Sequence, residues 1–211
     1  MEGQIGPVTK TLIAINVAIG LVMFSDELWG RMVFAGGLFP IRFTEGSAGF
    51  DGFLLPVLLT PFTAAFMHSG LSHLLLNMMM LLLMGRFVEQ VYGWRIFLLL
   101  YVIGILASAF VEVAVSPDPT MPVVGASGAI SAVIAAYVML FPRAKPEDLG
   151  PIPAKIAQPL KLFAGWAALN FMMQFIGATY DVVIAIWSHI GGFAAGLLLA
   201  HPLLRYKYRN A

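Results

Sequence analysis

Apolar residues are concentrated in six stretches of the chain, and most of the charged residues lie between them. A helix needs about 20 apolar residues to cross a hydrocarbon core of about 30 Å, and each stretch is close to that length. The pattern therefore predicts an all-α membrane protein with a single domain over residues 1–211. We expect the helices at about residues 8–25, 69–90, 94–115, 126–142, 156–177 and 183–204.

The segment at about residues 26–68 departs from this pattern. It is rich in glycine and phenylalanine and is broken by Pro40, Pro56 and Pro61. Connections longer than about 15 residues are usually functional or disordered. Its aromatic side chains indicate short amphipathic pieces in the outer membrane interface. The segment from 143 to 155 has the composition of an ordinary hydrophilic loop.

The overall composition excludes a soluble domain. The chain is 60% apolar and 11% charged, whereas soluble domains carry about 25% charged residues. The absence of cysteine excludes disulfides, thiolate metal sites and a cysteine nucleophile. The net charge of +1 gives no indication of nucleic-acid binding, and we expect no nucleic-acid partner.

The basic residues predict the orientation in the membrane. If the helices alternate in direction, ten of the twelve Lys and Arg residues fall on the side that holds both termini, which the positive-inside rule makes cytoplasmic. The chain is thus predicted to be a multi-pass protein, and its short ends favour a bacterial inner membrane. The ten are Lys10, Arg86, Arg95, Arg143, Lys145, Lys155, Lys161, Arg205, Lys207 and Arg209; the other side holds Arg31 and Arg42, with Asp26, Glu27, Glu45, Asp51, Asp118 and Asp181.

Two reactive polar residues begin apolar helices that run in the same direction. Ser127 opens the fourth stretch and His189 the sixth. At about 1.5 Å per residue, Ser127 lies about 22 Å from Phe141 and His189 about 24 Å from Leu204, so the two side chains have nearly the same depth. A histidine beside a serine can accept its proton and activate it as a nucleophile.

Small residues allow these two helices to approach closely. Gly192 and Gly196 follow His189 on its own helix face, and Gly128 and several alanines follow Ser127. Ordinary helix packing is the alternative reading of such a stripe.

A second polar cluster opens the second helix. His73 and Asn77 share a face, and the rise of about 26 Å from His73 to Gln90 puts them level with Ser127. Donors aimed at one point are what a tetrahedral oxyanion needs. Each residue also has a structural alternative. Ser127 would bond to its own helix, His73 or His189 would form a hydrogen bond between helices, and Asn77 would join two helices. The common depth of these four residues favours a functional site, because burying unrelated polar groups together in an apolar region is costly.

Two glutamates lie outside these clusters. Glu89 is expected to form an ion pair with Arg86 or Arg95. Glu112 has no assigned role.

The combined motifs resemble the rhomboid intramembrane serine proteases. That family opens its second helix with two histidines and an asparagine, its fourth with Gly-x-Ser-Gly and its sixth with His-x-x-Gly-x-x-x-Gly. The matching residues are His68, His73 and Asn77; Gly125, Ser127 and Gly128; His189, Gly192 and Gly196; and, for the Gly-x-x-x-Glu that closes the second helix, Gly85 and Glu89.

The resemblance implies a six-helix rhomboid-like bundle with a long interfacial first loop and no metal or organic cofactor. It implies a dyad of Ser127 and His189 without a third acidic member, and an oxyanion site made by His73, Asn77 and the backbone N–H of Ser127. His68 would support the first loop. The substrates would be transmembrane segments of proteins in the bilayer, entering past the fifth helix and the loop at about 178–186.

Two positions depart from the family pattern. Leu59 and Thr60 stand where the family often has a Trp-Arg pair in the first loop. Ser131 stands where the family often has an aromatic residue that packs on the histidine, so either His189 is held less rigidly or Ser131 forms a hydrogen bond to it.

Two rival functions remain open. One is a catalytically silent relative that binds transmembrane helices as a chaperone or adaptor, although such proteins usually lose the serine or the histidine. The other is a transporter or proton channel with His68, His73, His189 and Glu112 as a relay, although the chain shows no repeat of broken helices.

Overall fold

A computed structural model describes residues 4–23, 25–116, 119–142, 145, 147–178 and 184–209. Arg143, Asp118, Asp181 and residues 179–183 of the predicted entry loop lie outside this part. The described residues form helices and isolated β-bridges and no strand, so the all-α class is confirmed. The helices are α1 (Pro7–Val22), α2 (Asp26–Gly36), α3 (Ile41–Thr44), the 3₁₀-helix η1 (Val57–Leu59), α4 (Thr60–Ala64), α5 (Leu71–Met80), the π-helical turn η2 (Leu81–Gly85), α6 (Arg86–Tyr92), α7 (Trp94–Val115), α8 (Ser127–Leu140), α9 (Ala154–Ala178) and α10 (Ile186–Lys207).

Among the residues that the structure describes, two helices are long and apolar enough to cross a membrane by length and composition. One is the continuous run Leu71–Tyr92, formed by α5, η2 and α6, and the other is α7. Helices α1 and α8 are apolar but shorter. The expectation of six membrane spans stays a prediction.

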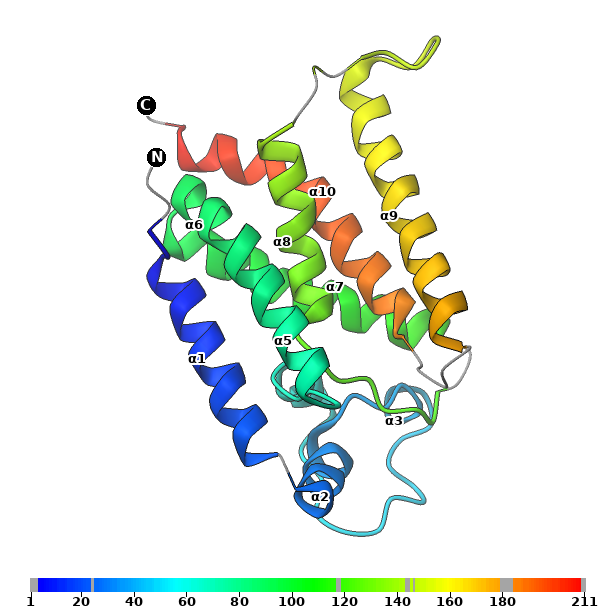
Figure 1. The fold of residues 1–211 in the computed structure, drawn as a ribbon. Helices are drawn as coiled ribbons and strands as arrows, with labels where there is room; N and C mark the ends of the chain where they lie inside the picture. The colour runs from blue at the N-terminus through cyan, green and yellow to red at the C-terminus, as the bar shows by residue number, and fades with distance from the viewer. Residues whose placement is uncertain are drawn as a thin grey trace.

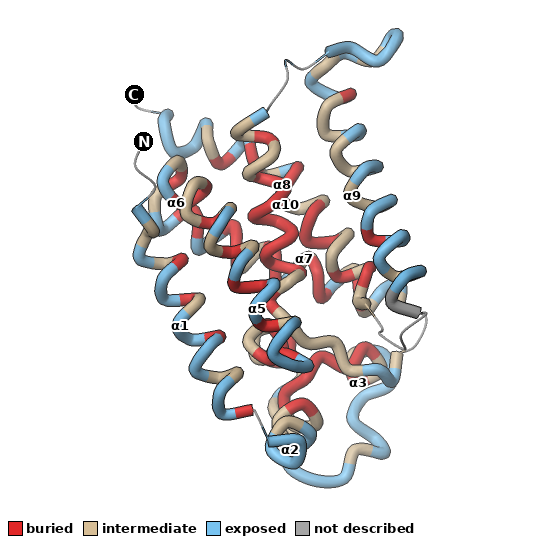
Figure 2. Tube along the Cα trace, in the orientation of Figure 1, coloured by how far each residue is buried: buried red, intermediate tan, exposed pale blue. Residues whose placement is uncertain are grey.

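The core of the bundle is centred on α8. Its alanines and Val133 are buried, and it packs mainly against α10 and α7. Figure 2 shows buried residues concentrated on α7, α8 and α10, whereas α1 and α9 expose most of their outer surface. The small side chains of α8 therefore allow three helices to come close together at the centre.

The two ends of the bundle differ in structure. Both termini lie at one end, and α2 and α3 lie at the other (Figure 1). Leu38 and Val123 exchange backbone hydrogen bonds of 3.2 and 2.8 Å, and the N–H of Gly125 donates to the carbonyl of Ala64 at 2.9 Å. The chain that leads into α8 is thus held by the segment at 26–68.

Arg42 anchors this segment in the absence of the Trp-Arg pair. Its side chain is buried and donates to the carbonyl of Leu55 at 2.8 Å and to Ser47 Oγ at 3.2 Å. The guanidinium also lies 5.8 Å from the ring centroid of Phe50. One buried cation therefore ties together three separate positions of the first loop.

The ion pair predicted for Glu89 is wrong. Its buried carboxylate accepts hydrogen bonds from the N–H groups of Val8 and Thr9, at 2.9 and 2.8 Å, and from the Thr9 hydroxyl at 2.7 Å. These N–H groups belong to the first turn of α1, where a helix lacks internal acceptors and favours a negative charge. Glu89 thus caps α1 and fastens it to α6.

Candidate active site

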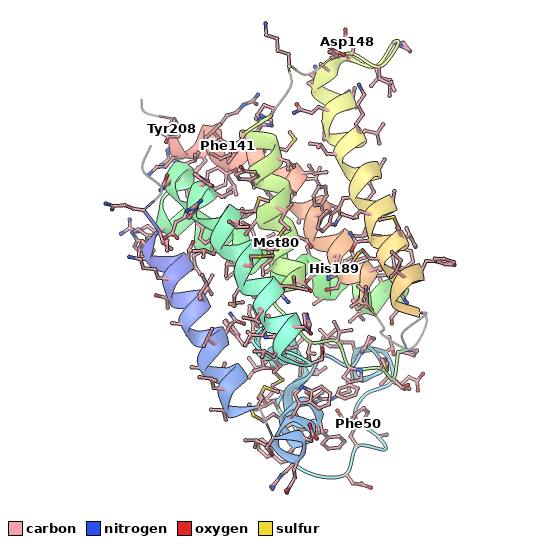
Figure 3. All side chains as sticks on the ribbon, in the orientation of Figure 1. Phe50, Met80, Phe141, Asp148, His189 and Tyr208 are labelled. Carbon is pink, nitrogen blue, oxygen red and sulfur yellow. The ribbon has the colours of Figure 1, made fainter. Side chains whose placement is uncertain are left out.

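Ser127 and His189 meet at the first turns of α8 and α10. His189 Nε2 lies 2.8 Å from Ser127 Oγ. Figure 3 shows His189 in the half of the bundle nearer to Phe50 and away from Phe141 and Tyr208. The two residues are 62 positions apart in the sequence, so the packing of α10 on α8 creates the contact.

Glycine permits this packing. A methyl group at Gly192 would overlap the carbonyl oxygen of Gly128, and one at Gly196 would overlap the carbonyl oxygen of Ala132. A methyl group at Gly128 would collide with Ser108 of α7. These glycines therefore allow the backbone contact that brings the histidine to the serine.

Gly125 forms the turn before the serine. Its φ of +123° favours glycine, and a Cβ there would lie 2.8 Å from Cε1 and Nε2 of His73. The imidazole of His73 consequently reaches the turn that carries Ser127. The opposite ring nitrogen, Nδ1, lies 3.0 Å from Ser69 Oγ, which holds the ring in this direction.

Asn77 and His68 lie near this cluster. Asn77 is buried, and its amide nitrogen donates to the carbonyl of His73 at 3.0 Å, so its described hydrogen bond stays within α5. The ring of His68 lies 5.0 Å from that of His73, and its carbonyl accepts from Trp29 Nε1 at 2.9 Å. Burial and then the neighbouring His73 lower the pKa of His68 to about 4. His68 therefore connects α2 to the start of α5 through its backbone carbonyl, and its imidazole is neutral.

Comparison with known proteins identifies the family. The family described as "Rhomboid domain" matches residues 57–206. The chain belongs to the rhomboid family. The matched residues include His73, Asn77, Ser127 and His189.

Three relatives illustrate the range of this family. "Inactive rhomboid-related protein 2" of Caenorhabditis elegans is 27% identical over 155 residues, which are 72% of this chain and 42% of that protein. "Rhomboid-related protein 3" of Homo sapiens is 43% identical over 77 residues, 36% of this chain and 18% of that protein. A Bacillus subtilis (strain 168) protein provisionally named rhomboid protease YdcA is 30% identical over 151 residues, 70% of this chain and 68% of that protein. The chain thus covers less than half of the worm and human rhomboids.

Ser131 forms no described hydrogen bond to the histidine of this rhomboid. Its hydroxyl donates to the carbonyl of Ser127 at 2.7 Å, a bond back to the previous turn of the same helix. The predicted alternative, a bond from Ser131 to His189, is therefore wrong. The family's aromatic packing residue has no substitute at position 131.

Sequence reasoning missed two polar side chains that contact α10. Asn170 on α9 lies 2.7 Å from His189 Nδ1, and Glu112 on α7 accepts the N–H of Ser188 at 2.7 Å. Both residues are buried. A buried polar residue within an apolar stretch is a functional signal in itself, but their partners lie on other helices.

The cluster can perform acid–base and nucleophilic chemistry. It joins a hydroxyl, an imidazole and a helix N-terminus. The part of the chain that the structure describes holds no group of three His, Asp or Glu side chains arranged to bind a metal ion. A serine hydroxyl beside an imidazole is an arrangement that can activate a nucleophile.

Proposed function

We propose that the protein is an intramembrane serine endopeptidase that cleaves transmembrane segments of membrane proteins. The observation that carries this proposal is the 2.8 Å contact between His189 Nε2 and Ser127 Oγ. His189 accepts the hydroxyl proton as Oγ attacks the scissile carbonyl carbon. The resulting imidazolium then donates that proton to the leaving amine, and water releases the acyl group from Ser127.

The proposed oxyanion site lies at the N-terminus of α8. Ser127 is the first residue of that helix, where backbone N–H groups have no internal acceptor and the helix dipole favours negative charge. His73 is supported by its approach to Gly125. Asn77 retains a second amide N–H beyond the one bonded to His73, and we assign it to the oxyanion.

The proposed location is a bacterial inner membrane with both termini in the cytoplasm. The distribution of basic residues supports this orientation, as does the position of both termini at one end of the bundle (Figure 1). The catalytic pair would then lie in the outer half of the bilayer, where a transmembrane substrate could reach it from the lipid.

A second candidate is a catalytically silent protein that binds transmembrane helices. It is favoured by the relative named as inactive, which matches 72% of this chain. Against it, this chain keeps both the serine and the histidine at hydrogen-bonding distance. The protease is therefore the better supported function.

The test is cleavage by the purified protein in detergent. We expect a model transmembrane substrate to be cut near its outer boundary, and a fluorophosphonate to label Ser127. Ser127→Ala and His189→Ala should each abolish cleavage, and the double variant should be no worse than either, because the two residues act as a unit. A folded wild-type protein that binds the substrate without cutting it would favour the silent candidate. Labelling that persists in Ser127→Ala would place the nucleophile elsewhere.

A further inference from the structure

Asn170 contacts the nitrogen of His189 that faces away from the serine. It lies on α9 and is 5% exposed. Its Oδ1 is 2.7 Å from His189 Nδ1, and His189 Nε2 is 2.8 Å from Ser127 Oγ. The imidazole is therefore held at both nitrogens, between two side chains from different helices.

A second hydrogen bond fixes which end of the amide faces the ring. Asn170 Nδ2 donates to the carbonyl of Trp166 at 2.9 Å, one turn earlier on α9. The amide oxygen consequently points at His189, and it can only accept. The proton of the neutral imidazole must then sit on Nδ1, which leaves the lone pair of Nε2 directed at the serine hydroxyl.

We propose that Asn170 is the positioning residue of a Ser127–His189–Asn170 triad. This inference rests on the proposed protease function and extends it, since the resemblance implies a dyad alone. Asn170 selects the Nδ1–H tautomer and holds the ring, as the third member of a triad does in soluble hydrolases. When Nε2 takes the serine proton, the same Nδ1–H bond stabilises the imidazolium with no proton transferred to Asn170.

The position of Asn170 also explains the tolerance of serine at position 131. Ser131 bonds to its own helix, so it gives the imidazole no support. Asn170 supplies that support from α9. Helix α9 packs mainly on α10, with Trp166 stacked on Phe193 at a centroid distance of 4.8 Å.

The test combines turnover with the tautomer of His189. Asn170→Leu removes the acceptor while filling a similar volume. Asn170→Asp keeps an oxygen able to accept from Nδ1–H. Trp166→Ala removes the ring that stacks on Phe193 of α10 but leaves the amide of Asn170 in place. Met173→Ala, at a side chain 48% exposed on α9, is the matched control.

We expect Asn170→Leu to lower kcat by about tenfold to a hundredfold with little change in KM, the range found when the partner that orients a histidine is removed from a metal site. Asn170→Asp should recover most of the turnover, and Met173→Ala should match the wild type. The ¹⁵N NMR spectrum should show Nδ1–H alone for His189 in the wild type and in Trp166→Ala, and a mixture of tautomers in Asn170→Leu.

An Nε2–H tautomer in the wild type would overturn the proposal, and so would wild-type kcat and tautomer in Asn170→Leu. A shift of the tautomer in Trp166→Ala equal to that in Asn170→Leu would reduce Asn170 to a contact that docks α9. Failure of the protease function is distinguishable, because the wild type would then neither cleave nor react with fluorophosphonate while the tautomer still depended on Asn170.

Discussion

At the scale of single residues, the described hydrogen bond of Asn77 must be separated from its proposed role at the oxyanion. Asn77 gives one amide hydrogen to the carbonyl of His73 four residues earlier, and that bond alone would be structural. Asn16 makes the same kind of bond to Leu12 at 2.8 Å on α1. The pair provides a direct comparison between an asparagine bonded to the backbone of His73 and one on a peripheral helix.

The oxyanion assignment predicts an effect on rate and not on binding. Asn77→Ala should lower kcat by about tenfold to a thousandfold, because a donor that acts on the developing charge matters mainly in the transition state. His73→Ala should behave similarly, whereas His68→Ala should act through loop order. Turnover and substrate affinity are measured separately in detergent. Asn16→Ala is the control and should keep the wild-type kcat.

If Asn77→Ala weakened substrate binding and left the turnover of bound substrate unchanged, Asn77 would be a structural residue. Equal losses of kcat in Asn77→Ala and Asn16→Ala would point to a general effect of removing a buried amide.

At the scale of helices, two buried carboxylates cap helices that belong to other parts of the chain. Glu89 caps α1, and Glu112 holds the N–H of Ser188 in the first turn of α10. An acceptor oxygen stabilises such a turn because the first N–H groups of a helix lack acceptors within the helix. Since His189 is the next residue, Glu112 sets the start of the helix that delivers the histidine.

Removal of Glu112 should therefore lower stability and activity together. We expect Glu112→Leu to lower the free energy of unfolding by about 1–3 kcal/mol, which is the cost of leaving a buried hydrogen-bond donor unsatisfied. Thermal unfolding in detergent measures this loss, and Glu112→Gln should recover part of it by keeping an acceptor oxygen. Glu27→Ala is the control, since its exposed pair with Arg31 at 3.8 Å should contribute about 1 kcal/mol or less. Equal midpoints for Glu112→Leu and the wild type would contradict the capping role.

At the scale of the whole molecule, orientation decides from which side the site is reached. A reporter fused after Ala211 should indicate the cytoplasm, and one inserted near Asp118 should indicate the outside, because ten of twelve basic residues fall on the side of the termini. A reporter after Lys145 serves as a control and should agree with the first. The reversed pattern would move Ser127 and His189, the proposed catalytic pair, to the cytoplasmic half of the bilayer.

The sequence by itself determined the helical class, the family and the pairing of Ser127 with His189. A long apolar run predicts a helix because the bilayer interior offers no water to the backbone, so every N–H and C=O group must form a hydrogen bond within the segment. Depth follows from the rise per residue, so residues at equal distances from one boundary can be matched without knowing the packing. The close approach at Gly192 and Gly196 could also be predicted, because their spacing on the helix face of His189 depends on the local sequence alone.

The tertiary structure decided the partners of the remaining polar residues. Asn170 meets His189 across 19 positions, Glu112 meets Ser188 across 76, and Glu89 meets Thr9 across 80. Local sequence shows only that each of these residues is polar within or beside an apolar run. Which donor or acceptor each one finds depends on the rotation and neighbours of whole helices, and these are fixed by the packing of α7, α8, α9 and α10 against one another.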